Sequence, residues 1–207
     1  MRPVAPPQGD DNGGQFVNSE VKLYHLFIRP GYHLHEERWR QTALAGWREE
    51  YMNSPALRPG IDRELRKALA WRWPKEGAKL TQKHRDWLCW LPELPRLIMA
   101  LGLMHLSCPD YVLLGEYRKA LEPALGMQAL NQLAGLWQGE GGQPDLTPDA
   151  LPYGALQVGM RLFAHQNEQD WVWKMIWHTL PAGQEGESPD VSSESVYRQM
   201  HRLRRFI

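Results

Sequence analysis

The chain is organised around the apolar stretch from Trp87 to Leu114, WLCWLPELPRLIMALGLMHLSCPDYVLL. Its residues recur at steps of three and four, which places them on one stripe of an α-helix: Leu94, Leu97, Ile98, Leu101, Met104 and His105. Leu103 and Leu106 widen the stripe, so we expect this helix to be buried on more than one side. Pro95 fits the first helical turn, where a missing N–H has no intrahelical partner to lose. The stretch therefore predicts a central core helix with other helices packed around it.

A membrane span is the main alternative for so apolar a stretch. Prolines and polar residues interrupt it well before the roughly 20 apolar residues that a bilayer requires: Pro92, Glu93, Pro95, Arg96, His105, Pro109 and Asp110. We therefore interpret the stretch as protein core.

Composition limits the classes of function. Lys+Arg and Asp+Glu are both 24 in 207 residues, so the formal net charge is zero, and no global field for nucleic acid or an acidic membrane is indicated. Ten tryptophans indicate either a tryptophan-rich core or exposed binding positions. Cys89 and Cys108 lack CxxC spacing, which favours a reduced, cytosolic protein over a disulfide framework.

The rest of the chain is predicted to be all-α, with a disordered tail at 1–20 and one helical domain from 21 to 207. The start, MRPVAPPQGDDNGGQ, is rich in Pro, Gly, Asp and Gln and has no apolar core of a secretory signal. Residues 21–28 fit a helical step better than strand alternation. Loops are predicted at 138–150 and 181–190.

Helical periodicity and start signals predict further helices in this order. They are Tyr32–Met52, Ile61–Trp73, a helix that Thr81 caps and that runs through Trp90, one opening at Cys108–Pro109–Asp110 with Leu113 and Leu114 inward, one around Met127–Trp137, Tyr153–His165, Gln169–Leu180 and Val191–Ile207. Pro123 and Gly126 are expected to interrupt the helices between them.

Two clusters raise the question of chemistry. His33 and His35 supply two imidazoles beside Glu36 and Glu37, and His-x-His can bind a metal when the backbone is extended. The surrounding pattern is helical, which turns the two rings apart, so we interpret them as surface histidines. The second cluster, His84 with Asp86 and Cys89, has the residue types of a nucleophilic site, but the apolar context of Cys89 disfavours a thiolate. The phosphate-loop, dinucleotide-loop and nucleophile-elbow motifs do not occur. We therefore expect no metal, no cofactor and no enzyme activity.

Two partner-binding surfaces are predicted instead. The last segment carries Arg198, Arg202, Arg204 and Arg205 against a single acid, Glu194. Such a helix can close the core, dock on an acidic partner, lie on a membrane surface, or bind nucleic acid. The helix at 169–180 is apolar nearly all round, so Trp173 and Trp177 are predicted to contact a partner or to be deeply buried.

A family resemblance gives these surfaces a context. The segment Phe27-x-x-Pro30-x-Tyr32-x-x-x-Glu36 resembles the N-terminal signature of the type III secretion sorting-platform accessory protein, the K component of the injectisome. The run Leu91-Pro92 … Leu97 … Leu101-Gly102-Leu103 and the pair Leu113-Leu114 are similar to later positions of that family. The Pro/Gly-rich start and the arginine-rich end depart from it.

The resemblance implies an all-α, non-enzymatic cytoplasmic adaptor that lies against the inner-membrane base of the secretion apparatus. Such an adaptor bridges the cytoplasmic domain of the inner-membrane ring protein to the pod protein, and reaches the stator and the export ATPase indirectly. Two alternatives stay open: a small metal-dependent enzyme that uses His33 and His35, and a helical nucleic-acid-binding regulator that uses the basic C-terminal helix.

Overall fold

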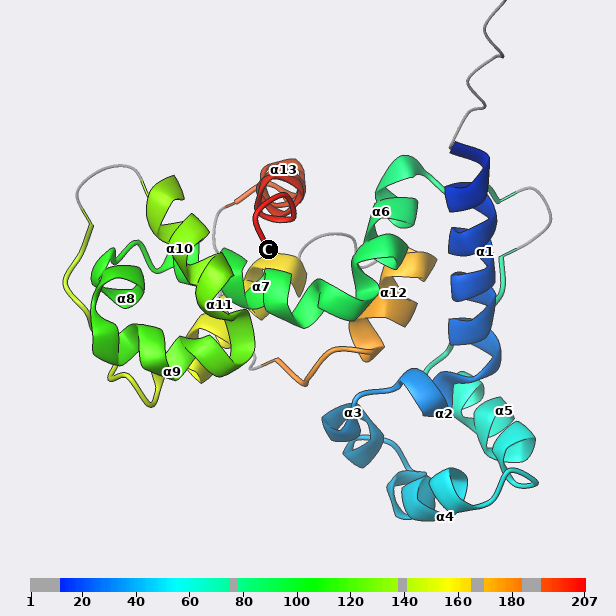
Figure 1. Cartoon of the computed structure of the whole chain (residues 1–207). Coiled ribbons are helices and arrows are strands. Elements are labelled where there is room, and N and C mark those ends of the chain that lie inside the picture. Colours follow the sequence, from blue (N-terminus) through cyan, green and yellow to red (C-terminus); the bar gives the residue numbers. More distant parts are fainter. Residues whose placement is uncertain (1–11, 75–77, 138–140, 165–169, 184–190) are drawn as a thin grey trace, which may run out of the picture.

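The computed structural model describes residues 12–74, 78–137, 141–164, 170–183 and 191–207, and within these ranges every regular element is helical. The all-α prediction is confirmed. In chain order (Figure 1), the elements are α1 Asn12–Ile28, α2 Pro30–His33, α3 Glu36–Arg40, the 3-10 turn η1 Ala45–Trp47, α4 Arg48–Asn53, α5 Arg58–Ala68, α6 Gln82–Trp90, the 3-10 turn η2 Leu91–Glu93, α7 Leu94–His105, α8 Asp110–Leu113, α9 Gly115–Leu125, α10 Met127–Leu136, α11 Leu151–Ala164, α12 Trp171–His178 and α13 Ser193–Leu203.

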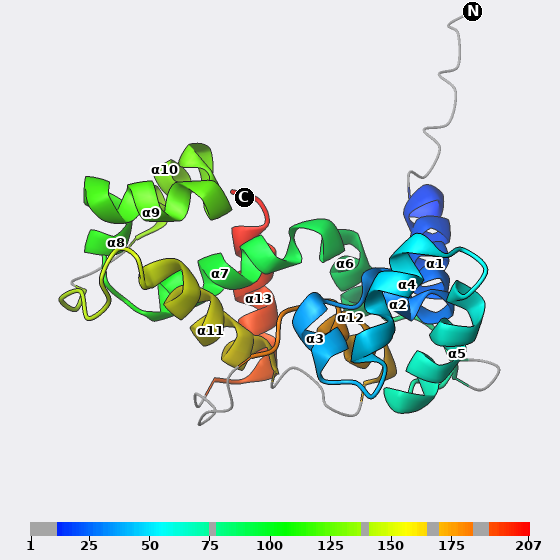
Figure 2. The same ribbon diagram turned by 90° about the horizontal axis from the view of Figure 1, so that it is seen from below.

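Helix α7 is the centre of the molecule, as its apolar stripe predicts. Leu94 and every residue from Leu97 to Leu103 are buried, so the helix is covered on more than one side. Figure 2 shows α11 crossing it. The two backbones touch because Gly102 and Gly159 have no side chain: a Cβ atom at Gly102 would lie 1.9 Å from the carbonyl oxygen of Ala155, and one at Gly159 would lie 1.9 Å from that of Ile98.

Helix α6 begins where the sequence predicts. The Thr81 side chain accepts a hydrogen bond from the N–H of His84, and the N–H of Thr81 donates to Nδ1 of His84, both at 3.2 Å. This reciprocal arrangement is a capping box, with histidine in the place usually taken by Glu or Gln. The stretch from Gln82 to His105 is long and apolar enough to cross a membrane, but its most apolar window is mostly buried in the protein. The η2 turn bends the chain between α6 and α7 (Figure 1).

The single helix predicted over Tyr32–Met52 is wrong, because the chain forms α2, α3, η1 and α4 there. Leu34 is extended, and His35 caps α3 by accepting a hydrogen bond from the N–H of Glu37 at 3.3 Å. Glu36 and Arg40 pair across one turn of α3, at 2.5 Å. An exposed pair of this kind contributes only about 0.3–0.5 kcal/mol, which is too little to hold a long helix together.

The pair Leu113 and Leu114 was predicted to face inward, but the side chains are 58% and 44% exposed. Leu114 is extended and separates α8 from α9, so Tyr111 and Val112 take the buried positions instead. Pro123 lies inside α9, which continues to Leu125, and Gly126 with φ +77° makes the break before α10.

Several boundaries also differ from prediction. Helix α1 begins at Asn12, nine residues before the expected start of order at Val21, while residues 1–11 of the expected tail lie outside the described ranges. Helix α5 ends at Ala68 rather than Trp73, because Ala70 adopts φ 51°. Residues 141–150 of the first predicted loop are irregular, and residues 138–140 and 184–190 lie outside the description.

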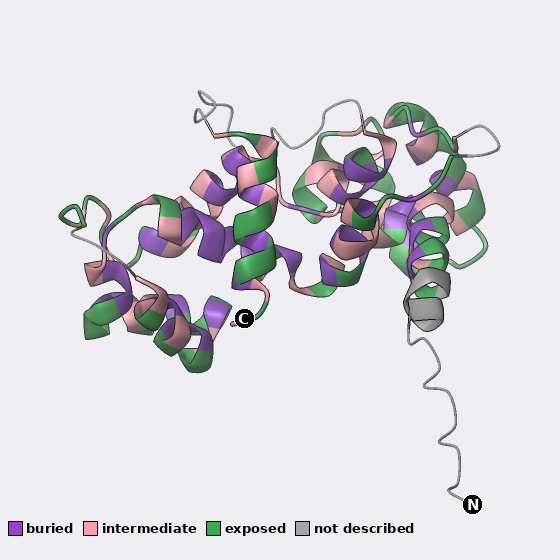
Figure 3. Cartoon of the chain, turned by 90° about the horizontal axis from the view of Figure 1, so that it is seen from above, coloured by how far each residue is buried: buried purple, intermediate pink, exposed green. Residues whose placement is uncertain are grey.

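Buried side chains form two clusters. The larger one lies among α1, α6, α7 and α8–α13, and the smaller one comprises Leu34, Trp39, Tyr51, Ile61 and Leu65 under α2–α5. The end of α12 joins them, since the carbonyl oxygen of His178 accepts a hydrogen bond from the N–H of His35 at 3.1 Å. Figure 3 shows buried residues along α7 and α11 and exposed residues on the outer side of α13. The single-domain organisation stays a prediction.

Candidate interaction surfaces

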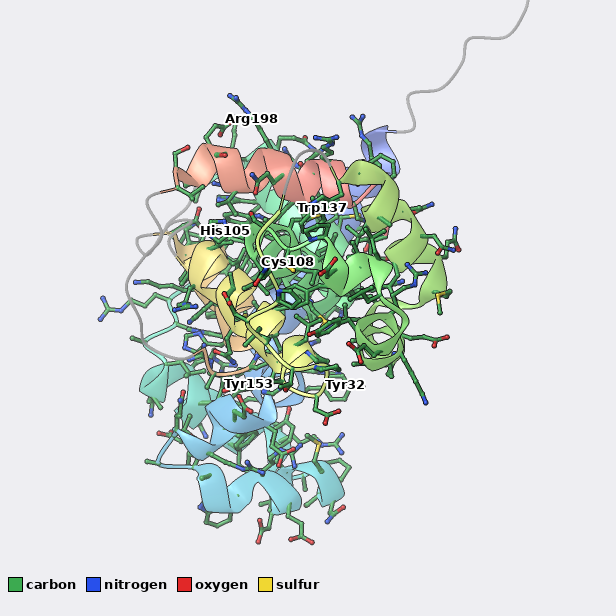
Figure 4. All side chains as sticks on the ribbon, turned by 90° about the vertical axis from the view of Figure 1, so that its left-hand side faces the viewer. Tyr32, His105, Cys108, Trp137, Tyr153 and Arg198 are labelled. Carbon is green, nitrogen blue, oxygen red and sulfur yellow. The ribbon has the colours of Figure 1, made fainter. Side chains whose placement is uncertain are left out.

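One side of helix α13 is buried in the protein, and the opposite side carries arginines that face solvent. Ser192 caps its start, and Val196, Met200 and Leu203 are buried at steps of four and three, as predicted. Arg198, Arg202 and Arg205 are exposed, and Arg198 points away from the molecule in Figure 4. The Nε of Arg198 lies 3.1 Å from a carboxylate oxygen of Glu194 on the same helix. The Nε of Arg204 lies 3.0 Å from a carboxylate oxygen of Glu93 and is half-buried. We call Arg198, Arg202 and Arg205 the arginine face.

An aromatic contact fixes the orientation of the arginine face. The ring of Tyr197 stacks on Trp90, with 6.0 Å between centroids, and its hydroxyl donates to Asp86. Burial raises the pKa of Tyr197, and the bond to Asp86 raises it further, so the phenol stays protonated and continues to donate. Since α13 is held on one side by these contacts, the arginines occupy its free side.

The two predicted tryptophans do not form an exposed surface. Trp173 and Trp177 stack at 5.2 Å and 15°, but Trp173 is only 5% exposed and belongs to the larger core. Trp177 is half-buried, and the guanidinium of Arg38 lies 4.9 Å from its ring centre. Trp173 therefore belongs to the core, and burial accounts for the apolar character of much of α12. A role of Trp173 and Trp177 in partner binding stays a prediction.

A buried pair of polar side chains ties α12 to α6. Asp170 caps α12 by accepting from the N–H groups of Val172 and Trp173 at 2.8 and 2.9 Å, and its other oxygen lies 2.5 Å from Nε2 of His84. Because Nδ1 of His84 accepts from Thr81, Nε2 carries the proton and donates. Burial by itself would raise the pKa of Asp170, but the bonds from His84 and the two N–H groups outweigh it and lower that pKa.

The hypothetical group of His84, Asp86 and Cys89 is not brought together. His84 bonds Asp170, Asp86 bonds Tyr197, and the Cys89 thiol is exposed. These contacts tie α6 to the start of α12 and to α13, and the three side chains offer no nucleophile–base pair.

His33 and His35 are likewise separated in role. His35 uses Nδ1 to cap α3. Burial lowers the pKa of His33, and the nearby charges of His25 and Arg29 lower it further. Among the described residues, no group of three or more His, Cys, Asp and Glu side chains is placed to hold a metal ion.

A cleft of about 710 Å³ between α1, α2, α4 and α5 is the first surface that sequence reasoning missed. We call it the cationic cleft, because its walls carry six basic side chains: Lys22, His25, Arg29, His33, Arg58 and Arg66. Among the described residues that line it, Asp62 is the one acid. It is 4% exposed and accepts hydrogen bonds from the N–H of Gly31 at 3.0 Å and the hydroxyl of Tyr51 at 3.3 Å. Burial raises the pKa of Asp62. The cleft is thus positive overall.

A second groove, of about 700 Å³, lies beside the outer face of α1. Tyr24 and Trp73 meet edge to face at 6.2 Å in it, Trp171 lies 5.8 Å beyond Trp73, and Tyr24 and Trp73 are each about half exposed. Local sequence patterns do not predict this groove. They predict a helix that ends at Trp73, whereas the chain turns at Ala70 and brings the Trp73 ring against Tyr24 of α1.

Comparison with known proteins gives these surfaces a setting. A model of a type III secretion system subunit family matches residues 21–182. The chain belongs to that family. No curated protein and no solved structure matches it. The matched part of this secretion subunit includes the cationic cleft and all of the second groove except Glu20. It ends before α13, so the arginine face lies outside it.

Proposed function

We propose that this secretion subunit is a non-enzymatic cytoplasmic adaptor of the sorting platform, the K component of the injectisome. It links the cytoplasmic domain of the inner-membrane ring protein to the pod protein, and through the pod it connects to the stator and the export ATPase. Its place is peripheral to the inner-membrane base of the apparatus.

The family match is the observation that carries the proposal, because it places most of the chain in a secretion subunit family. The structure adds a geometric argument. Helix α13 packs beside α7, whereas α4 and α5 lie at the bottom of the view in Figure 1, away from α13. Two positively charged surfaces on separate parts of the molecule suit a protein that binds two partners at once.

Affinity purification from the native host tests the adaptor role. The tagged full-length subunit, purified while the secretion system is expressed, is expected to recover the ring protein, the pod protein, the stator and the ATPase together, as read by mass spectrometry. If none of the four is recovered under those conditions, the adaptor role is refuted.

The arginine face is expected to hold one of the two partners. In the double variant Arg202→Glu/Arg205→Glu, recovery of one partner should fall at least about tenfold, because two attractive charges become repulsive. Recovery of the other partner and the far-UV circular dichroism spectrum should stay unchanged, since both side chains are exposed.

The matched control is Lys119→Glu/Lys174→Glu, which changes the net charge equally at two exposed lysines on α9 and α12. Both partners should be recovered with it as with the wild type. Unchanged recovery of both partners with the arginine variant would remove α13 from the interaction. If the control variant loses the same partner to the same extent, the effect comes from the change in net charge and not from the arginines of α13.

A further inference from the structure

The positive charges of the cationic cleft are not balanced by ion pairs with acidic side chains. Within the described residues, the ion pairs of the chain lie elsewhere, and none includes Lys22, Arg29, Arg58 or Arg66. Arg29 is exposed and Lys22 is half-exposed, so both charges face the cleft opening. Asp62 carries at most one negative charge, which acts on Arg66 and Arg29, so it cannot balance all four of these positive charges.

Two of the arginines are fixed by the main chain rather than by acids. Arg66 donates to the carbonyl oxygens of Phe27 at 3.3 Å and Ile28 at 2.8 Å, at the end of α1. Arg58 donates to those of Tyr51 and Met52 at 2.9 and 2.7 Å. Their charges remain in the cleft although their donors are engaged, so the site has a broad positive potential and lacks a tight set of converging donors.

The rest of the wall is apolar. Leu26, Ile28, Pro55, Pro59 and Leu91 line it together with the ring of Tyr32, which is 67% exposed. A phosphate group would leave these surfaces uncovered, whereas a peptide can place carboxylates against the cations and apolar side chains against the wall. The size of the cleft, about 710 Å³, is also that of a short peptide segment rather than of a single ion.

From this combination we propose that the cationic cleft binds an acidic segment of a partner protein, whose carboxylates face Lys22 and Arg29 and whose apolar side chains pack on Tyr32 and Ile28. The choice of a protein as the occupant rests on the proposed adaptor role. The net charge of zero for the whole chain disfavours nucleic acid, which needs a field over many phosphates.

The test is a fluorescence-anisotropy titration of the full-length subunit with a short fluorescein-labelled peptide of glutamate, leucine and glycine. Wild type is expected to bind this peptide, to bind it more weakly as salt is raised, and to ignore the same peptide with glutamine in place of glutamate. Arg29→Glu should weaken binding at least about tenfold, because it turns an attraction into a repulsion at the cleft opening. Arg29→Lys should retain it.

Lys119→Glu is the matched control, since it makes the same charge change on the exposed side of α9 and should bind as wild type does. Equal weakening in Arg29→Glu and Lys119→Glu, or no binding of the peptide to wild type, overturns the proposal. It is also overturned if single-stranded DNA displaces the peptide and itself depends on Arg29. The peptide titration is independent of the affinity purification, so the cleft and the adaptor role can fail separately.

Discussion

Replacing Gly159 by alanine is expected to cost more than about 3 kcal/mol of the free energy of unfolding. The new Cβ would lie 1.9 Å from the carbonyl oxygen of Ile98 and 3.0 Å from its side chain. A flexible side chain could move aside, but this neighbour is the backbone of α7, so the two helices would have to separate. Separation opens space along the most buried surface of the protein, and the lost packing adds to the strain. Gly102→Ala should behave in the same way, because its Cβ meets the backbone of Ala155 and Gly159.

Urea unfolding followed by circular dichroism measures the effect. Gly135→Ala is the control, since Gly135 lies in α10, is exposed, and has nothing within 4 Å of an added Cβ. That variant should be neutral or more stable by up to about 1 kcal/mol, because alanine favours the helix. A Gly159→Ala midpoint equal to that of wild type would contradict the close approach of α7 and α11.

Removing the carboxylate in Asp170→Ala is expected to cost about 2–4 kcal/mol. The loss of a helix cap contributes about 1 kcal/mol, and the buried Nε2–H of His84, left without an acceptor, contributes about 1–3 kcal/mol. His84→Ala should cost a similar amount. The double variant should cost clearly less than the sum of the two, because each single change removes the same 2.5 Å contact. Additive costs would mean that the two side chains do not interact.

The same pair predicts a dependence of stability on pH. The pKa of Asp170 is lower in the folded than in the unfolded protein, so the unfolded state binds the proton more readily as the pH falls. The stabilisation is therefore complete above the unfolded pKa of about 4 and is lost as the pH falls through the folded value. The difference in unfolding free energy between wild type and Asp170→Ala should shrink below about pH 4. A difference that stays constant from pH 7 down to pH 3 would contradict this linkage.

Local signals predicted the elements that depend on neighbouring residues. The apolar stripe from Leu94 to Leu101 correctly predicted α7, and Thr81 correctly predicted the start of α6. The break of Tyr32–Met52 into short helices was missed because histidine is not among the usual capping residues, so His35 gave no stop or start signal. The inward prediction for Leu113 and Leu114 failed for a related reason, since periodicity did not reveal the extended Leu114.

The surfaces depend on distant residues and could be predicted less well. The arginine face was found because its charges and its buried stripe lie in one helix. The sequence pattern around Trp173 fits either burial or contact with a partner. Trp173 is buried because α12 packs against α6, where Asp170 contacts His84, which lies 86 residues away in the chain. The cationic cleft takes its residues from 22–33, 51–66 and Leu91, each of which looks like an ordinary surface or core position by itself.

The contact between α7 and α11 has a consequence for synthesis of the chain on the ribosome. Helix α7 ends at His105 and α11 ends at Ala164, with α8, α9 and α10 made between them. At a translation rate of about 5–20 residues per second, α11 is completed roughly 3–12 s after α7, and until then the side of α7 that contains Gly102 is not covered by α11. During that interval the nascent subunit exposes an apolar helix surface, and this is the stage at which a chaperone or premature self-association would compete with folding.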